Sequence, residues 1–236
     1  MTHSDKILYD FSMVRRLHPI IKNQIYHIFN RSVAKQPIFK TPNDYSRFIN
    51  VSDFYRFSSP GLRYSFYNRL DAKNRLEFIE RLRKDGQKAV SIFAFCLIDN
   101  HFHFLLRNLE ENGIQSFARK IQDSYAKYIN LKNKRTGALF QEMFKAVRID
   151  SDEQFLHVAR YIHLNPISSF VANTIEDLKN YPWSSLPGYI GKNKFDFVDN
   201  EFLNSFYLNE KELRKFTFDQ ADYLLKLKEK EYLFLE

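Results

Sequence analysis

Apolar positions along the chain follow two periodicities, one typical of strands and one typical of helices. Runs rich in β-branched and aromatic residues predict four strands, at residues 24–33, 90–98, 101–107 and 139–149. Only Asp99 and Asn100 separate the second run from the third. Because these two residues favour tight turns, we expect the two runs to form a hairpin.

Helices are predicted in the segments between and after these strands. Helical patterns occur at residues 42–57, 71–84 and 114–133, and in the stretch that follows Ser151. The order of elements predicts an α+β fold with a ferredoxin-like βαββαβ core, whose sheet is antiparallel. Extra helices would occupy the first connection, and a helical C-terminal tail would begin near residue 209.

Charge and composition point to a polyanionic partner. The 236 residues carry a formal net charge of +8, and 17% of them are aromatic. A basic chain with many aromatic rings suits single-stranded nucleic acid, because bases stack on rings while cations follow the phosphates. Composition alone also leaves open a basic protein whose lysines are simply solvated.

Cysteine usage and apolar content bear on the compartment. Cys96 is the single cysteine and cannot form an internal disulfide, which suits a reducing cytosol. The N-terminus has no hydrophobic run like that of a signal peptide. No stretch approaches the ~20 apolar residues that span a bilayer. We therefore expect a cytoplasmic protein with no membrane partner.

Two histidines separated by one residue are the first candidates for chemistry. His101 and His103 lie in a predicted strand, where residues i and i+2 project to the same face. Imidazole is a common ligand of divalent metal ions, so both rings could bind one ion. Any His-x-His pair in a strand meets this pattern, so the pair alone is weak evidence for a metal site. Further candidate side chains on a later helix strengthen it.

That later helix contains Tyr161 and Asn165, which are four residues apart and so share a helix face. A phenol can act as a covalent nucleophile, and an amide oxygen could complete a metal site. Asn165 could equally be a helix-terminal residue, because Pro166 is expected to stop the helix. We interpret His163 as structural and assign no function to His27.

Five short stretches of the chain, taken in order, resemble one protein family. They are residues 26–31 (YHIFNR), 94–106 (AFCLIDNHFHFLL), 135–141 (RTGALFQ), 160–166 (RYIHLNP) and 181–185 (YPWSS). Together they are similar to the HUH-class single-strand DNA transposases with one catalytic tyrosine, in the branch called REP-associated tyrosine transposases. The resemblance implies a catalytic domain at residues 24–191, between an N-terminal arm (1–23) and a helical C-terminal extension (192–236).

The resemblance also implies a role for each candidate residue. His101 and His103 would be the histidine pair of the HUH motif and would bind Mg²⁺ or Mn²⁺, with Asn165 as a third, helix-borne ligand. Tyr161 would attack a DNA phosphate, leaving a 5′-phosphotyrosine and a free 3′-OH. The covalent link would then allow rejoining without ATP. The family's ferredoxin-like fold agrees with the pattern described above.

The implied substrate is single-stranded DNA that contains a hairpin. Four basic residues are predicted to hold its phosphates, namely Arg31, Lys145, Arg148 and Arg160. The protein could act as a monomer or as a homodimer, because both occur among related proteins.

Two other functions stay open at this point. The chain could be a hairpin-binding protein that has lost its chemistry, or a metal-dependent phosphoesterase that uses the histidine pair with water as the nucleophile. The presence of both histidines and of Tyr161 favours the enzyme that nicks and rejoins DNA.

The basic charge generates a first prediction. We expect the affinity for a single-stranded hairpin to fall steeply as salt rises, because each phosphate contact releases counterions. Fluorescence anisotropy of a labelled hairpin across a KCl series measures this dependence. A flat response to salt would contradict a basic DNA-binding groove.

Overall fold

We describe the protein from a computed structural model, which defines residues 19–233 apart from residues 142, 193 and 208. Most of the predicted N-terminal arm, residues 1–18, lies outside the described residues. Within the described part of the chain, no helix is both long enough and apolar enough to cross a membrane.

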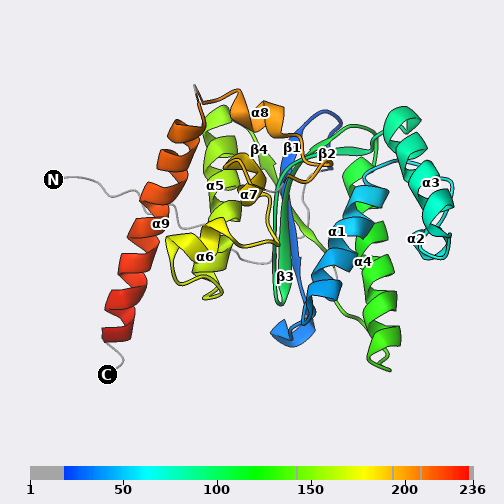
Figure 1. Ribbon diagram of the computed structural model, residues 1–236, viewed down its shortest axis with the longest axis horizontal. Coiled ribbons are helices and arrows are strands. Elements are labelled where there is room, and N and C mark those ends of the chain that lie inside the picture. The colour runs from blue at the N-terminus through cyan, green and yellow to red at the C-terminus, as the bar shows by residue number, and fades with distance from the viewer. Residues whose placement is uncertain (1–18, 142, 193, 208, 234–236) are drawn as a thin grey trace.

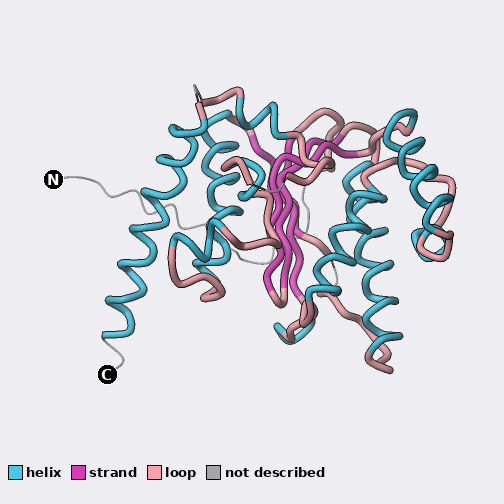
Figure 2. Tube along the Cα trace, in the orientation of Figure 1, coloured by secondary structure: helices cyan, strands magenta, loops and turns pink. Residues whose placement is uncertain are grey.

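A four-stranded antiparallel sheet forms the centre of the fold (Figures 1 and 2). Its strands are β1 (Ile25–Arg31), β2 (Val90–Ile98), β3 (His101–Asn108) and β4 (Lys145–Ile149), in the spatial order β2-β3-β1-β4. Every neighbouring pair is antiparallel. The predicted α+β fold with an antiparallel sheet is therefore confirmed, and so is the hairpin between β2 and β3.

Helices cover both faces of the sheet (Figure 1). Helices α1 (Pro42–Tyr55) and α4 (Gly113–Lys132) pack together on one face, whereas α5 (Asp152–Ser168) covers the other. Helix α9 (Glu210–Leu233) runs alongside α5 on its outer side. The shorter elements are η1 (Val33–Lys35), α2 (Tyr64–Tyr67), α3 (Ala72–Asp85), α6 (Ile175–Lys179), α7 (Leu186–Tyr189) and α8 (Asn200–Asn204).

Alternate side chains of β3 enter different layers, as the two-residue period of a strand requires. Phe102 and Phe104 project toward α1 and α4, and the Phe102 ring lies 5.1 Å from that of Phe48 in α1. His101 and His103 project to the opposite face, toward α5. The aromatic core on one face thus fixes the strand whose other face carries the histidines.

The fourth strand is shorter than the sequence predicts. We expected a strand at residues 139–149, but β4 begins only at Lys145, and Phe140 makes an isolated bridge to Ser32. The side chains of Leu139 and Phe140 are buried, and the Phe140 ring packs against Phe102 at 5.8 Å. The chain therefore leaves the edge of the sheet where these two side chains are buried, and the Phe140 ring enters the aromatic core between the sheet and α1.

Pro166 does not stop the tyrosine-bearing helix, contrary to our expectation. Helix α5 continues to Ser168, with Pro166 inside its last turn. A proline there removes one backbone donor, but little helix remains to be disrupted beyond it. The Pro166 carbonyl accepts the N–H groups of Val171 and Ala172, each at 2.9 Å, so its acceptor is satisfied.

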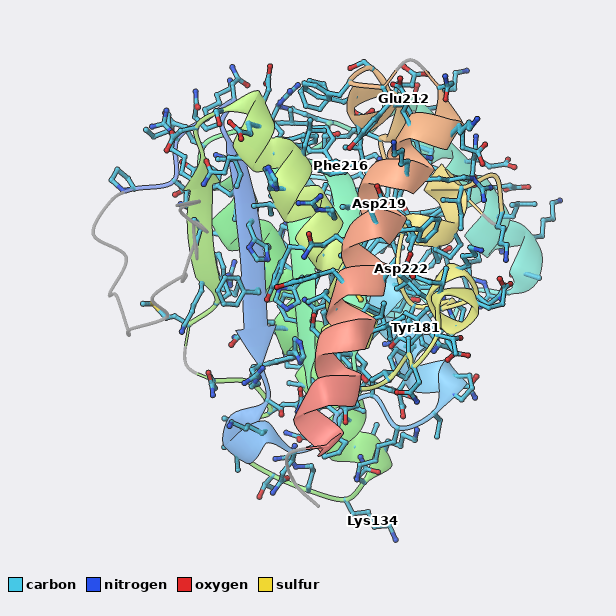
Figure 3. All side chains as sticks on the ribbon, turned by 90° about the vertical axis from the view of Figure 1, so that its left-hand side faces the viewer. Lys134, Tyr181, Glu212, Phe216, Asp219 and Asp222 are labelled. Atoms are coloured by element: carbon cyan, nitrogen blue, oxygen red, sulfur yellow. The ribbon has the colours of Figure 1, made fainter. Side chains whose placement is uncertain are left out.

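The predicted C-terminal helix is confirmed as α9, which packs against α5 (Figure 3). Arg160 of α5 lies over the Phe216 ring of α9, with its guanidinium carbon 4.0 Å from the ring centroid. Its Nη1 also donates a hydrogen bond of 3.3 Å to the Phe216 carbonyl oxygen. These contacts hold the helix that carries Tyr161. The domain boundary after residue 191 stays a prediction.

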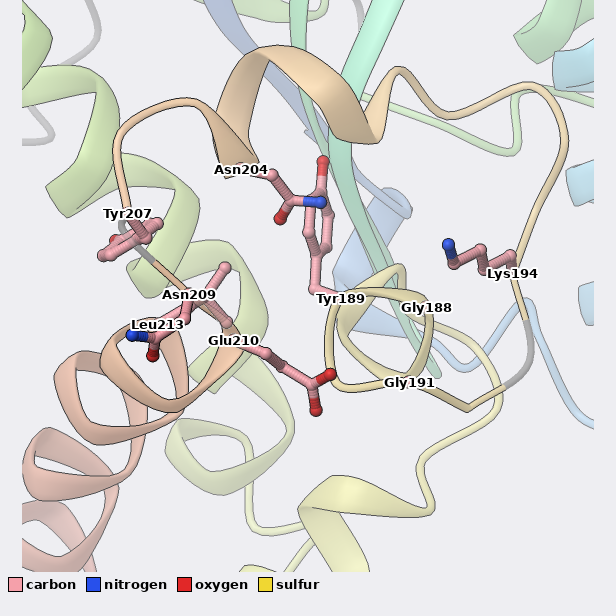
Figure 4. A pocket seen from close by; sticks show the side chains of 9 residues that line it. All are labelled: Gly188, Tyr189, Gly191, Lys194, Asn204, Tyr207, Asn209, Glu210 and Leu213. Atoms are coloured by element: carbon pink, nitrogen blue, oxygen red, sulfur yellow. The ribbon is translucent and has the colours of Figure 1, made fainter.

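A cavity of about 300 Å³ lies where α7, α8 and the start of α9 meet (Figure 4). Tyr189, Tyr207 and Glu210 contribute to its lining. None of the residues predicted to take part in metal binding, catalysis or DNA binding lines this cavity.

The core around β3 generates a stability prediction. Phe104 is 1% exposed and packs among aromatic rings, so Phe104→Ala should lower the free energy of unfolding by about 3–5 kcal/mol. Phe66→Ala is the matched control, because Phe66 is 51% exposed and should lose little. Urea denaturation followed by circular dichroism measures both variants. Equal destabilisation of the two would contradict the assigned core.

Candidate active site

Strand β3 carries both candidate histidines on the face of the sheet that α5 covers. His101 pairs with Arg31 of β1, and His103 pairs with Phe29. Directly paired residues project to the same side of an antiparallel sheet. The two imidazoles are buried, with ring centroids 5.1 Å apart and nearly perpendicular planes. Two imidazole rings that could act as metal ligands therefore lie close together.

Helix α5 places Tyr161 and Asn165 over these histidines. The helix begins after Ser151, as predicted, and the Ser151 hydroxyl accepts a backbone N–H at 3.1 Å. The Tyr161 ring meets His103 edge-on, with centroids 5.7 Å apart. The Asn165 Oδ1 lies 3.1 Å from Nε2 of His101. The structure therefore brings together the four residues that we predicted from the sequence to take part in metal binding and nucleophilic attack.

Burial favours the neutral form of both β3 histidines. Burial lowers the pKa of His101; its contact with the Asn165 side chain opposes this shift, and the positive charge of Arg31 adds to it. Burial lowers the pKa of His103 well below the usual value, and neighbouring basic groups lower it further. A neutral imidazole keeps one nitrogen lone pair, which is the form that binds a metal ion.

The hydrogen bonds around His101 indicate where its proton lies. The Asn100 side chain donates through Nδ2 to the Lys35 carbonyl oxygen, so its Oδ1 faces Nδ1 of His101 at 2.6 Å. Since an amide oxygen only accepts, Nδ1 must carry the proton. The Nε2 lone pair of a neutral His101 then faces Asn165 Oδ1, which is a second acceptor. Two acceptors are therefore directed at each other.

A divalent cation fits this arrangement. Adjacent ligands of an octahedral ion with bonds of about 2.1 Å lie about 3.0 Å apart, close to the 3.1 Å between His101 Nε2 and Asn165 Oδ1. The buried Asn165 Nδ2 makes no hydrogen bond, so that amide is not held by a protein acceptor. Among the described residues, no three His, Cys, Asp or Glu side chains form a group that could hold a metal. The Asn165 amide oxygen lies beside His101 and is available as a further ligand.

Two of the four predicted DNA-binding residues lie on this face of the sheet. Arg31 pairs with His101 across β1 and β3, and its charge acts on both histidines. Lys145 of β4 pairs with Phe29, which itself pairs with His103, so all three share the face. The Lys145 Nζ lies 6.0 Å from the Phe29 ring centroid. Both cations therefore border the histidine pair.

The structure does not bring the other two cations to the site in the same way. Arg148 pairs with Tyr26, whose side chain belongs to the opposite face, and its Nε forms an ion pair of 2.8 Å with Asp150. Arg160 is next to Tyr161 in sequence, but its guanidinium group contacts Phe216 of α9 and the His157 ring. A DNA-binding role for either residue stays a prediction.

One residue of this site, His27 of β1, was assigned no function from the sequence. Its Nε2 lies 2.9 Å from Nδ1 of His103, and both rings are buried. The Tyr161 ring also contacts His27, with centroids 5.9 Å apart. The position of His27 in a predicted strand was visible in the sequence, but the register between β1 and β3 was not. His163, interpreted as structural, hydrogen-bonds Ser185 Oγ at 2.9 Å and is buried.

Comparisons with known proteins find a matching family model and several solved structures with a similar fold. Residues 60–165 match the family model described as IS200-like transposase, and this stretch includes His101, His103, Tyr161 and Asn165. A solved structure described as the REP-associated tyrosine transposase bound to a REP hairpin aligns with a TM-score of 0.52 at 14% sequence identity. The alignment covers 79% of this chain and 98% of that one. At this identity the match shows a shared fold. No curated protein sequence matches the chain.

Both comparisons agree with the resemblance inferred from the sequence stretches. The chain is therefore similar to the IS200-like transposases over residues 60–165, and it shares the fold of the REP-associated tyrosine transposase.

Proposed function

We propose that this chain, which is similar to the IS200-like transposases over residues 60–165, nicks and rejoins single-stranded DNA through a covalent bond to Tyr161. The observation that carries the proposal is the convergence of two elements. Strand β3 supplies a pair of buried imidazoles, and α5 supplies an amide oxygen and a phenol beside them. The family match supports a transposase-like DNA-processing function in general.

His101, His103 and Asn165 would hold Mg²⁺ or Mn²⁺. When bound, the ion would polarise the scissile phosphate and stabilise the charge that develops on the leaving 3′ oxygen. The three side chains contribute no negative charge of their own, so the site does not repel the phosphate that it must bind. Arg31, on the same face, adds a positive charge beside the phosphate.

Tyr161 is suited to the role of nucleophile because it is 38% exposed and lies at the edge of the imidazole pair. Its phenolic oxygen would form a bond to phosphorus, the bond from phosphorus to the 3′ oxygen would break, and the phenolic proton would pass to solvent. The 3′ oxygen would leave as a hydroxyl group after taking up a proton. One phosphodiester replaces another, so a 3′-OH can reverse the step without ATP.

We propose single-stranded DNA with a hairpin as the substrate. The solved structure with the shared fold is bound to a REP hairpin, and this chain carries a net charge of +8. Arg31 and Lys145 border the histidines and would contact phosphates near the scissile bond. We include Arg148 and Arg160 as phosphate contacts farther from that bond.

The central prediction concerns the covalent intermediate. Incubation of the protein with a labelled library of single-stranded hairpins and Mn²⁺ should yield a protein–DNA adduct that survives denaturing electrophoresis. Tyr161→Phe should abolish the adduct, because phenylalanine has no nucleophilic oxygen, and EDTA should prevent it. Tyr223→Phe is the matched control, since Tyr223 is also an exposed tyrosine but lies on α9.

Two results would overturn this proposal. Metal-dependent cleavage without an adduct, unchanged in Tyr161→Phe, would identify a phosphoesterase that uses water. Tight hairpin binding with neither cleavage nor adduct would identify a DNA-binding protein without chemistry.

The sheet register generates a prediction about DNA contacts. Lys145→Ala should weaken hairpin binding and reduce the salt dependence by about 0.7 in the logarithmic slope, as expected for one lost single-strand phosphate contact. Arg148→Ala should change the slope less, because Arg148 lies on the opposite face and pairs with Asp150. Anisotropy titrations at several KCl concentrations compare the two. An equal or larger effect of Arg148→Ala would contradict the assigned DNA-binding face.

A further inference from the structure

His27 forms a buried imidazole pair with His103. The Nε2 atom of His27 and the Nδ1 atom of His103 are 2.9 Å apart, and the ring planes are stacked at 23°. Phe29 and Tyr161 each contact both rings, with centroid distances between 4.8 and 5.9 Å. The pair is therefore a fixed hydrogen bond between two buried rings, and an imidazole must be neutral to bind a metal ion.

Such a bond holds one proton and has two possible arrangements. In the first, His27 Nε2–H donates to His103 Nδ1, and the only proton of His103 lies on Nε2. In the second, His103 Nδ1–H donates to His27 Nε2, and the His103 Nε2 atom keeps its lone pair. Only the second arrangement leaves His103 with a nitrogen that can bind a metal ion, because Nδ1 already faces His27.

We propose that His27 is a positioning residue that accepts the Nδ1 proton of His103 and thereby directs the Nε2 lone pair of His103 to the metal. This inference rests on the proposed function, because it assumes that His103 binds the ion. Histidine ligands in proteins commonly donate their second ring N–H to a neighbouring acceptor, which fixes their tautomer and orientation. In this chain the acceptor is an imidazole from the adjacent strand.

A neutral acceptor suits the chemistry of this site. Carboxylates are frequent acceptors for ligand histidines, but a carboxylate would place a negative charge beside the phosphate to be bound. The His27 imidazole orients His103 without adding any charge. His101 follows the same rule, because its Nδ1 faces the neutral amide oxygen of Asn100 at 2.6 Å.

The alternative is that the His27 ring only fills space next to Phe29. Two substitutions separate these roles. His27→Gln keeps an acceptor, since Oε1 of glutamine can occupy the place of Nε2, but it loses the ring. His27→Phe keeps an aromatic ring and loses the acceptor. A positioning role predicts that glutamine rescues function and phenylalanine does not, whereas a packing role predicts the reverse.

The tautomer can be measured without any metal. We would label the histidines of the full chain with ¹⁵N and record long-range ¹H–¹⁵N correlations of the metal-free protein. The expected result is a His103 ring protonated at Nδ1. A His103 ring protonated at Nε2 would overturn the inference. This experiment needs no variant at position 27, so it remains decisive even if His27→Phe does not fold.

Metal affinity supplies the second measurement. Mn²⁺ titration followed by electron paramagnetic resonance should show about 10–100-fold weaker binding for His27→Phe, the usual effect of losing such an acceptor. His27→Gln should bind within a few-fold of the unchanged protein. His163→Gln is the control, because His163 is equally buried but bonds Ser185 instead of a candidate ligand. Thermal unfolding curves would establish that each variant is folded.

The outcomes distinguish this inference from the proposed function. Unchanged Mn²⁺ affinity in a folded His27→Phe, or a loss in His27→Gln that exceeds it, would overturn the role of His27. If the unchanged protein formed no tyrosine–DNA adduct but showed Nδ1–H on His103 and weaker Mn²⁺ binding in His27→Phe, the proposed function would fail while the positioning role would stand.

Discussion

The hydrogen-bonded register between β1 and β3 is the constraint on which the candidate site depends. It sets Arg31 opposite His101 and Phe29 opposite His103, and it brings His27 within hydrogen-bonding distance of His103. Side chains alternate along a strand, so a slip of one residue would turn every one of these groups on β1 to the other face of the sheet. Hydrogen bonds between main chains thus determine which side chains can act together.

The two faces of the sheet divide structural and chemical roles. On one face, Phe102 and Phe104 pack against α1 and α4 and hold β3 in place. On the other, three imidazoles are buried beneath α5, and their polar contacts within the described part of the chain are to one another, to Asn100 and to Asn165. Burying neutral imidazoles that are hydrogen-bonded costs far less than burying charges. The core can therefore contain a polar cluster, provided that its rings stay neutral.

The spacing of residues within one strand or one helix allowed much of the candidate site to be predicted from the sequence. The parts that depend on pairing between distant strands could not be predicted. The i, i+2 spacing of the histidines and the i, i+4 spacing of Tyr161 and Asn165 depend only on strand and helix geometry. The partner strand of β3 and its register depend on the whole fold, so the contact of His27 could not be deduced. The same limit applies to Arg148, because pairing with β1 decides which face of the sheet its side chain occupies. It also applies to the start of β4, because Phe140 is buried in the core and does not continue the strand.

The distribution of the site over β1, β3 and α5 has a consequence for the order in which the chain assembles. The β2–β3 hairpin has a two-residue turn and can form early, whereas docking of β1 and α5 requires the closure of long loops. A partly folded chain that holds only the hairpin has His101 and His103 but no tyrosine beside them. The proposed nicking chemistry would then require the completed tertiary structure, because only that structure places Tyr161 beside the histidines.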